Sequence, residues 1–261
     1  MLAPVAINSG SAPFKVDSGS TPSSQFVVQP SNANACSACR VRGLCHPGGL
    51  SESDTRQFDA LVFSRRRVKQ GHALYRAGDP CGSVYLVRSG FVKAVVMHAD
   101  GREQVSGFYM AGEMLGLDGL ASGLHVSDAT ALIDTDVCVV PFERLETLGR
   151  ETQAMQRHLN RMLSQEVVRK QSMMLLLGSM RADERVATFL LNLSQRFTAQ
   201  GFSPSDFLLR MTREEIGSLL GMKLETVSRV FSKFQKAQIV KIEGKHVRIV
   251  SIEGLGAMIG H

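Results

Sequence analysis

Three of the five cysteines stand close together near the start of the chain, in the spacing Cys36-x2-Cys39-x5-Cys45. Glycine and proline residues around them allow a loop to wrap tightly around a bound metal or cluster. Thiolates are the soft ligands that zinc and iron–sulfur clusters prefer, and both kinds of site need four ligands. The spacing therefore predicts a metal or cluster site, and a four-iron cluster would need a fourth cysteine from elsewhere in the chain.

Three kinds of site fit this spacing. An iron–sulfur cluster would take its fourth thiolate from Cys81 or Cys138, and spacing alone does not choose between them. Zinc would take His46 in a Cys3His site, although Cys45 and His46 are awkward as co-ligands because they are adjacent. A disulfide switch is the third alternative, and a reducing compartment suits it least.

A second set of polar residues lies on two short predicted helices, over residues 213–220 and 224–235. Thr212 and Glu215 have the spacing of a capping box, which starts the first helix. Gly221 supplies the turn between the helices, so the segment has the pattern of a helix-turn-helix. Apolar residues mark a buried stripe on the second helix and leave its polar residues on an outer face.

That outer face has the chemistry for reading base pairs in a DNA major groove. Arg229 can pair with guanine O6 and N7, Glu225 can accept from cytosine N4, and Ser228 can contact a neighbouring base. Contacts to the DNA backbone would come from nearby hydroxyl and ammonium groups, namely Thr226, Lys233, Lys236 and Lys245. The alternative is a solvated helix on which Glu225 and Arg229 form an ordinary ion pair.

The elements that must position these residues follow from length, charge and pattern. A chain of 261 residues fits two modest domains and a flexible end. Residues 181–250 hold twelve Lys or Arg and seven Asp or Glu, and therefore most of the formal net charge of +6. That basic end suits a polyanionic partner. We expect an α+β chain with a disordered arm over 1–35, a cysteine loop over 36–50, a β-roll over 51–148, a dimerisation helix over 149–179, and a winged helix-turn-helix over 180–261.

Short β-type runs separated by turn residues predict the antiparallel β-roll. These runs are 73–75, 83–87, 91–97, 104–110, 128–131 and 136–140. In the C-terminal segment we expect a further helix over 186–197 and a hairpin of 239–242 with 247–250, turning at Gly244. This hairpin would be the wing beside the helix-turn-helix.

Between them, a helical pattern runs from Arg150 to Leu177 without proline or glycine. Such a helix would be about 40 Å long. It carries two apolar stripes, of which Met155, Leu159 and Met162 form one and Leu163, Val167 and Met174 form the other. One stripe can cover the roll while the other meets a second copy of the helix, as in a coiled-coil homodimer. The alternative is a single buried helix with one broad apolar face.

Several classes of protein are disfavoured by what the sequence lacks. There is no run of about 18 apolar residues to span a membrane. The first residues lack the pattern of a secretory signal, so we expect a cytoplasmic protein. No P-loop, G-x-S-x-G, H-E-x-x-H or G-x-G-x-x-G motif occurs, so we expect no enzyme. An iron–sulfur electron carrier could use the cysteines, but it would not need a basic helix-turn-helix.

Two runs of residues give the chain a family resemblance. The run Glu225-Thr226-Val227-Ser228-Arg229 resembles the E-x-x-S-R recognition helix of the FNR branch of the CRP/FNR transcription regulators. The run 190–197 with Gly201-Phe202-Ser203-Pro204 after it is also similar to that branch. The resemblance implies a cyclic-nucleotide-binding-like β-roll used as a sensor, and inverted TTGAT half-sites as DNA targets.

The same resemblance implies a cofactor and partners. It implies an oxygen-labile 4Fe-4S cluster on Cys36, Cys39, Cys45 and Cys138, since the run around Cys138 resembles the strand that supplies the distant ligand. The protein would dimerise without oxygen, bind palindromic promoter sites and control anaerobic gene expression as a global regulator. Contact with RNA polymerase would come from a hairpin tip of the roll, at Asp100 and Gly101.

Cyclic nucleotides are not expected as ligands. Cyclic-AMP receptors of this family hold the ligand with a Gly-Glu pair and an Arg-Ser pair. The chain keeps Gly112-Glu113, but the matching Arg-Ser position is Val126-Ser127. A phosphate would lack its cation there, and burying an unpaired charge is costly.

Overall fold

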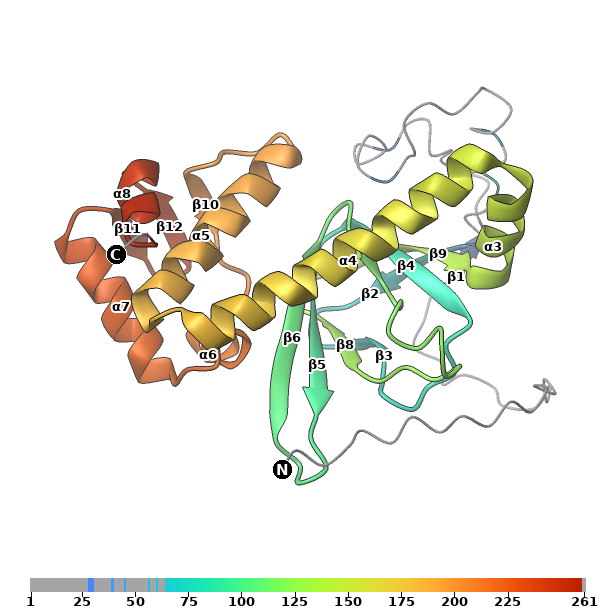
Figure 1. Cartoon of the computed structure of the whole chain (residues 1–261), viewed down its shortest axis with the longest axis horizontal. Coiled ribbons are helices and arrows are strands. Elements are labelled where there is room, and N and C mark those ends of the chain that lie inside the picture. Colours follow the sequence, from blue (N-terminus) through green and yellow to red (C-terminus); the bar gives the residue numbers. More distant parts are fainter. Residues whose placement is uncertain are drawn as a thin grey trace.

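The structure is a computed structural model that describes Val28–Pro30, Cys39, Cys45, Arg56, Ala60 and residues 64–259. The predicted α+β class is confirmed: a β-roll lies along one side of the long helix α4 (Gln153–Ser179), and a mostly helical C-terminal part gathers at the end of that helix (Figure 1). Cys36, His46 and most of the predicted arm and cysteine loop lie outside the described residues.

The roll consists of two antiparallel sheets, with strand orders β1-β2-β9-β4-β7 and β3-β8-β5-β6. The strands are β1 (Val28–Pro30), β2 (Ser64–Val68), β3 (Ala73–Tyr75), β4 (Ser83–Ser89), β5 (Phe91–Met97), β6 (Glu103–Met110), β7 (Met114–Leu115), β8 (Asp128–Ala131) and β9 (Thr135–Pro141). Apolar side chains of both sheets, among them Leu74, Val87, Val92 and Val137, form the core between them.

The six predicted runs are confirmed as β3, β4, β5, β6, β8 and β9, whereas three strands were not expected. Strand β2 carries consecutive arginines at 65–67, yet it pairs with β9 from Ser64 to Val68. Strand β7 is too short for an alternating pattern to show. Val28–Pro30 pair with β2, so the prediction of a disordered arm is wrong for these three residues. The side of β2 that faces away from β9 offers the backbone groups to which β1 adds.

The helical segment after the roll is divided at Thr152 rather than continuous. Helix α3 (Phe142–Glu151) ends and α4 begins on either side of this residue, whose φ of −123° and ψ of 112° are extended. The Thr152 N–H donates to the Leu148 carbonyl, and its own carbonyl accepts from Gln156. The expected start of the long helix near Arg150 is therefore wrong, and the chain turns there so that α3 packs against α4.

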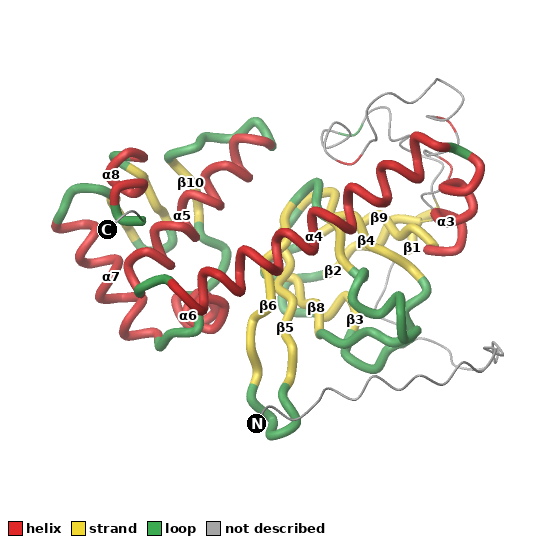
Figure 2. The backbone as a smooth tube through the Cα atoms, viewed as in Figure 1, coloured by secondary structure: helices red, strands yellow, loops and turns green. Residues whose placement is uncertain are grey.

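The C-terminal part is a helix-turn-helix with a wing (Figure 2). Its elements are α5 (Ala182–Ala199), β10 (Asp206–Leu208), α6 (Arg213–Leu220), α7 (Leu224–Lys236), β11 (Val240–Glu243), β12 (His246–Ile249) and α8 (Ile252–Ala257). The predicted helices and hairpin are confirmed to within a few residues. Strand β10 was not expected, and it pairs with β12 to make the wing a three-stranded sheet in the order β10-β12-β11.

The roll and the C-terminal part share one apolar core. Phe108 of β6 meets Phe189 of α5 edge to face, with ring centroids 6.4 Å apart. Val105 and Met110 of β6 belong to the same buried cluster as Leu190 and Ile216 of the C-terminal part. The two parts are therefore packed on each other rather than joined only through α4.

Arg185 near the start of α5 fixes the connection with α4. Its guanidinium donates to the carbonyl oxygens of Leu177, Met180 and Leu220, at 2.8–2.9 Å. Carbonyl groups at helix ends lack intrahelical partners, and one side chain satisfies them for both α4 and α6. This makes Arg185 the joint between the long helix and the helix-turn-helix.

Of the helices described, none is both long and apolar enough to cross a membrane.

The turn of the helix-turn-helix depends on Gly217. A Cβ at this position would lie 2.6 Å from the Met222 carbonyl oxygen, so Gly217→Ala must displace backbone. We expect it to lower the free energy of unfolding by about 1–3 kcal/mol. Gly178→Ala in α4 is the matched control, since its Cβ meets nothing within 4 Å and alanine favours the helix by up to about 1 kcal/mol.

Urea unfolding followed by circular dichroism measures both variants, because the chain has no tryptophan for fluorescence. Equal effects of the two substitutions would contradict a steric requirement at Gly217.

Candidate nucleic-acid interface and cysteine site

The predicted capping box starts helix α6. The Thr212 hydroxyl accepts from the Glu215 N–H at 3.1 Å, and the Glu215 carboxylate accepts from the Thr212 N–H at 2.7 Å. Gly221 ends the helix in the left-handed conformation, with φ 62° and ψ 41°. Glycine adopts that conformation at low cost, so the sequence sets the angle at which α7 follows α6.

Helix α7 buries the predicted apolar stripe and exposes the predicted polar face. Its buried side chains are Val227, Val230, Phe231 and Phe234. Glu225 and Arg229 are exposed and Ser228 is partly exposed. The amphipathic pattern therefore fixes which side of the helix can meet another molecule.

The polar face is organised without an ion pair between Glu225 and Arg229 in the described part of the chain. The Arg229 guanidinium instead donates to the Thr226 hydroxyl at 3.3 Å. The Ser228 hydroxyl accepts from Arg213 of α6 at 3.2 Å. The predicted base-reading residues thus share one surface. Arg213 also lies at this surface, which the sequence did not lead us to expect. Its place directly after the capping residue Thr212, at the start of α6, could have indicated it.

The predicted backbone-binding lysines differ in their surroundings. Lys236 and Lys245 are exposed at the end of α7 and at the wing turn. Lys233 donates to Asp183 of α5 at 2.7 Å. The hydrogen bond from Lys233 holds the pKa of the Asp183 carboxyl below its ordinary value. Lys233 therefore ties α7 to α5, which sequence spacing did not indicate.

Helix α4 has one covered stripe and one bare stripe. Met155 is buried, and Leu159 packs beside it against the roll. Leu163, Val167 and Met174 remain 45%, 55% and 73% exposed. The predicted division into two stripes is thus present, and the single buried face considered as an alternative is not.

Lys170 lies on the same helix beside the bare stripe. Its ammonium donates to the Ser106 carbonyl at 3.3 Å and pairs with Glu166 at 3.4 Å. These contacts hold the charge against the roll, which reduces the repulsion that two facing lysines would cause in a helix pair.

Two of the predicted cysteine ligands, Cys39 and Cys45, lie close to Cys138. We call the region where these three residues meet the layer of Cys138. Cys138 on β9 is buried, and burial is the main cause that raises the pKa of its thiol. Cys39 also acts on the Cys138 thiol electrostatically, while Cys45 packs against the apolar cluster that contains Cys138. Among the residues that the structure describes, no group of three or more His, Cys, Asp or Glu forms a complete metal site.

Cys81 has different neighbours. Its thiol donates to the Gly116 carbonyl at 3.3 Å, and burial followed by the charge of Asp118 raises its pKa. These partners belong to the 116–125 loop, not to the layer of Cys138. The geometry favours Cys138 over Cys81 as the distant partner of the cysteine loop.

An open cavity of about 630 Å³ lies between the roll and α4. Tyr75, Asp118, Ser127 and Val167 are among its lining residues. The Ser127 hydroxyl donates to Asp118 at 2.7 Å, so a carboxylate stands beside this hydroxyl in the lining.

The predicted polymerase contact is an exposed turn. Asp100 accepts from Arg102 at 2.7 Å, and this bond is the main cause that lowers the pKa of the Asp100 carboxyl. Gly101 has a φ of 85°, which closes the turn between β5 and β6. The tip is ordered by its own side chains and is accessible.

Comparison with family models gives two matches. Residues 65–152 match the cyclic nucleotide-binding domain and residues 184–258 match the Crp-like helix-turn-helix domain.

Relatives extend the match to most of the chain. The transcriptional regulatory protein btr of Bordetella pertussis is 41% identical, covering 88% of this chain and 95% of its own. The transcriptional activator protein anr of Pseudomonas aeruginosa is 44% identical, with 86% and 92% covered. The fumarate and nitrate reduction regulatory protein of Escherichia coli is 38% identical, with 87% and 90% covered.

Among solved structures, that of FixK2 from Bradyrhizobium japonicum is similar. It has a TM-score of 0.69 and 32% sequence identity, and the match covers 76% of this chain and 97% of that one.

The Lys233–Asp183 pair predicts a pH-dependent stability. Since the pKa of Asp183 is lowered in the folded chain, its stabilising effect is complete above the unfolded value of about 3.9 and is lost as the pH falls through the folded value. We expect Asp183→Asn to lower the free energy of unfolding by about 0.5–1 kcal/mol at pH 7. The difference from the wild type should shrink below pH about 4.

Urea titrations at steps between pH 7 and pH 3 measure this difference. Lys233→Met is the matched variant and should show the same pH window. A difference that persists unchanged at the lowest pH would refute the ion pair as its source.

Proposed function

The chain belongs to the Crp/Fnr family of transcriptional regulators, and from this we propose that it is an oxygen-sensing member of it. It would bind a 4Fe-4S cluster, dimerise when oxygen is absent and bind inverted TTGAT half-sites, controlling anaerobic gene expression as a global regulator. The observation that supports DNA reading best is the exposed polar face of α7 above a fully buried apolar stripe.

On DNA, Arg229 would pair with guanine, Glu225 would accept from cytosine and Ser228 would contact a neighbouring base. Thr226, Lys236 and Lys245 would bind phosphates and set affinity rather than sequence. Lys233 would do so as well, although its ammonium is shared with Asp183. Two copies of α7 related by a two-fold axis would meet successive major grooves of a palindromic site.

Dimerisation would use the bare stripe of α4. Three large apolar side chains, Leu163, Val167 and Met174, stand exposed on one helix of about 40 Å. A second copy of the helix packed against them would remove this apolar surface from water. Dimerisation would therefore place the two copies of α7 in a fixed relation.

The cysteines described fit the proposed cluster. Its usual ligands are thiolates, and Cys39 and Cys45 are both brought to the layer of Cys138. Cys36 would be the fourth ligand. When bound, such a cluster would be the group that reacts with oxygen. The chain's own contribution is placement, because Cys45 touches the same apolar cluster as Met155 and Leu159 of α4. The state of the cysteine loop would thereby bear on how α4 packs.

The RNA polymerase contact would be the exposed turn at Asp100 and Gly101. A cyclic nucleotide would find no phosphate site in the roll. Ser127 is bound to Asp118, and Glu113 is paired with arginines rather than lining the cavity. The effector would therefore act through the cysteines.

Anaerobic purification followed by brief exposure to air tests the sensor. We expect the absorbance and Mössbauer spectra of a 4Fe-4S cluster, bleaching in air, and parallel loss of dimer and of binding to a TTGAT palindrome. Cys138→Ser should abolish the cluster, whereas Cys81→Ser is the matched control and should retain it. Stoichiometric zinc, or a colourless protein that binds the DNA with or without air, would overturn oxygen sensing and leave DNA binding standing.

Arg229→Ala tests base reading. We expect a loss of about 1–3 kcal/mol in binding free energy and relaxed specificity at the guanine position, measured by fluorescence anisotropy with matched and mismatched duplexes. Lys236→Ala is the contrasting variant, because loss of a phosphate contact should weaken all duplexes alike and lower the salt slope by about 1. Unchanged discrimination in Arg229→Ala would exclude this residue from base reading.

A further inference from the structure

Glu113, in the turn between β6 and β7, lies between the two parts of the chain. Its carboxylate accepts from Arg196 of α5 twice, at 2.9 Å from Nε and 2.6 Å from Nη2. The same Nη2 also donates to the Phe108 carbonyl at 2.7 Å. The side chains of Glu113 and Arg196 are only 15% and 20% exposed, so water screens this pair weakly.

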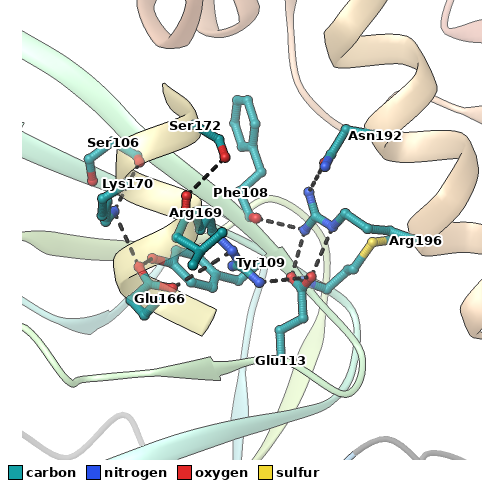
Figure 3. Close-up of polar contacts among 12 residues, drawn as sticks. Ser106, Phe108, Tyr109, Glu113, Glu166, Arg169, Lys170, Ser172, Asn192 and Arg196 are labelled. Atoms are coloured by element: carbon teal, nitrogen blue, oxygen red, sulfur yellow. Dashed lines mark hydrogen bonds and ion pairs between the residues drawn. The ribbon is translucent and has the colours of Figure 1, made fainter. Parts of the chain in front are cut away.

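The same carboxylate faces the long helix. Arg169 of α4 lies 3.5 Å from Glu113, and its guanidinium stands over the Tyr109 ring at 5.5 Å. Figure 3 shows both guanidinium groups meeting this one carboxylate. Glu113 therefore joins the roll, α4 and α5 at a single point, which we name the Glu113 clamp: Glu113, Arg169 and Arg196.

The Glu113 carboxylate is also held by the backbone of its own turn, independently of the two arginines. It also accepts from the Met110 N–H at 2.9 Å, within its own turn. Gln200, just beyond α5, donates to the Ala111 carbonyl in that turn at 2.8 Å. The turn thus presents a fixed acceptor to the end of α5, and little side-chain freedom remains to be lost when the pair forms.

Helix α5 is held at its start by Arg185, which binds the carbonyls at the ends of α4 and α6. Phe189 of α5 also packs on Phe108 of β6, but apolar contact is not directional and leaves the helix able to turn about its held end. Arg196 lies about 16 Å further along, so its pair with Glu113 supplies a second fixed point. Two fixed points set the direction of α5 and of the helix-turn-helix packed on it.

We propose that the Glu113 clamp positions the helix-turn-helix for DNA binding and links its orientation to the dimerisation helix. The held orientation leaves Glu225 and Arg229 of α7 exposed, as a reading surface requires. Through Arg169, the clamp touches α4 on the segment that carries Val167 and Lys170. Pairing of two α4 helices and orientation of α5 thereby involve the same carboxylate. The inference rests on the proposed DNA-binding function.

A double-mutant cycle in the full-length chain tests the clamp. The variants are Glu113→Gln, Arg196→Gln and the double variant, with the conservative Glu113→Asp as a second probe of folding. We expect each single variant to weaken binding to a TTGAT palindrome by roughly 5- to 30-fold. The double variant should lose no more than either single one, because the two side chains act as a unit. Additive losses, or stronger binding, would overturn the proposal.

Two further readouts separate positioning from other roles. The slope of affinity against salt should stay as in the wild type, since no phosphate contact is removed. Glu103→Gln, at the exposed start of β6, is the charge-matched control and should bind as the wild type does. A changed slope, or an equal loss in the control, would show that general electrostatics rather than the clamp is responsible.

Amide hydrogen exchange distinguishes failure of the clamp from failure of the proposed function. Val105 donates its N–H to Ser218 of α6 at 2.8 Å, so its exchange reports how firmly the helix-turn-helix lies on the roll. Arg196→Gln should speed exchange at residues 105–113 whether or not the chain binds the chosen DNA. If the wild type does not bind the duplex, the proposed function is refuted. If amide exchange in Arg196→Gln equals that of the wild type, the clamp is refuted.

Discussion

The long helix α4 must cover two apolar surfaces, and a single chain covers only one of them. Met155 and Leu159 pack on the roll, whereas Leu163, Val167 and Met174 on the other stripe remain open. Exposed apolar surface of this extent on one helix favours association with another apolar surface. In the proposed dimer, the axis of the assembly and the spacing of the two reading helices both follow from how these stripes are used. The roll, the joint at Arg185 and the clamp at Glu113 then determine where α7 lies relative to that axis.

Local patterns were sufficient for most of the elements. Strands β3, β5 and β8 have the expected bounds, because alternating side chains and turn glycines are properties of neighbouring residues. The capping box at Thr212 and the glycine at 221 set α6 for the same reason. The buried stripe of α7 was also predictable, since a short helix against a core must place its large apolar residues on one face.

The remainder depends on contacts between distant residues. Strand β2 carries three arginines and forms because β1 and β9 pair with it on either side. Thr152 divides the helices where no proline or glycine stands, and α3 folds back on α4 there. The partners Glu113 and Arg196 are separated by 83 residues, so neither residue carries a local sign of the other. Cys138 could be chosen over Cys81 from family resemblance, and the layer it shares with Cys45 supports that choice on independent grounds.

These contacts also bear on the proposal that the roll serves an effector other than a cyclic nucleotide. The acidic residue of the Gly-Glu pair is turned toward α5 and paired with Arg196, and Ser127 is held by Asp118. Glu113 and Ser127 are thus both engaged inside the protein, and Val126, at the position that resembles the arginine of cyclic-AMP receptors, is 54% exposed. In the proposed function, the signal enters through the cysteines instead. The layer of Cys45 and Cys138 touches the first turns of α4, Arg169 brings Glu113 to the middle of that helix, and Arg185 holds its end. Helix α4 thus contacts the proposed sensor site, carries the apolar stripe of the proposed dimer and is joined to the helix-turn-helix. A change in how α4 packs can therefore reach all three.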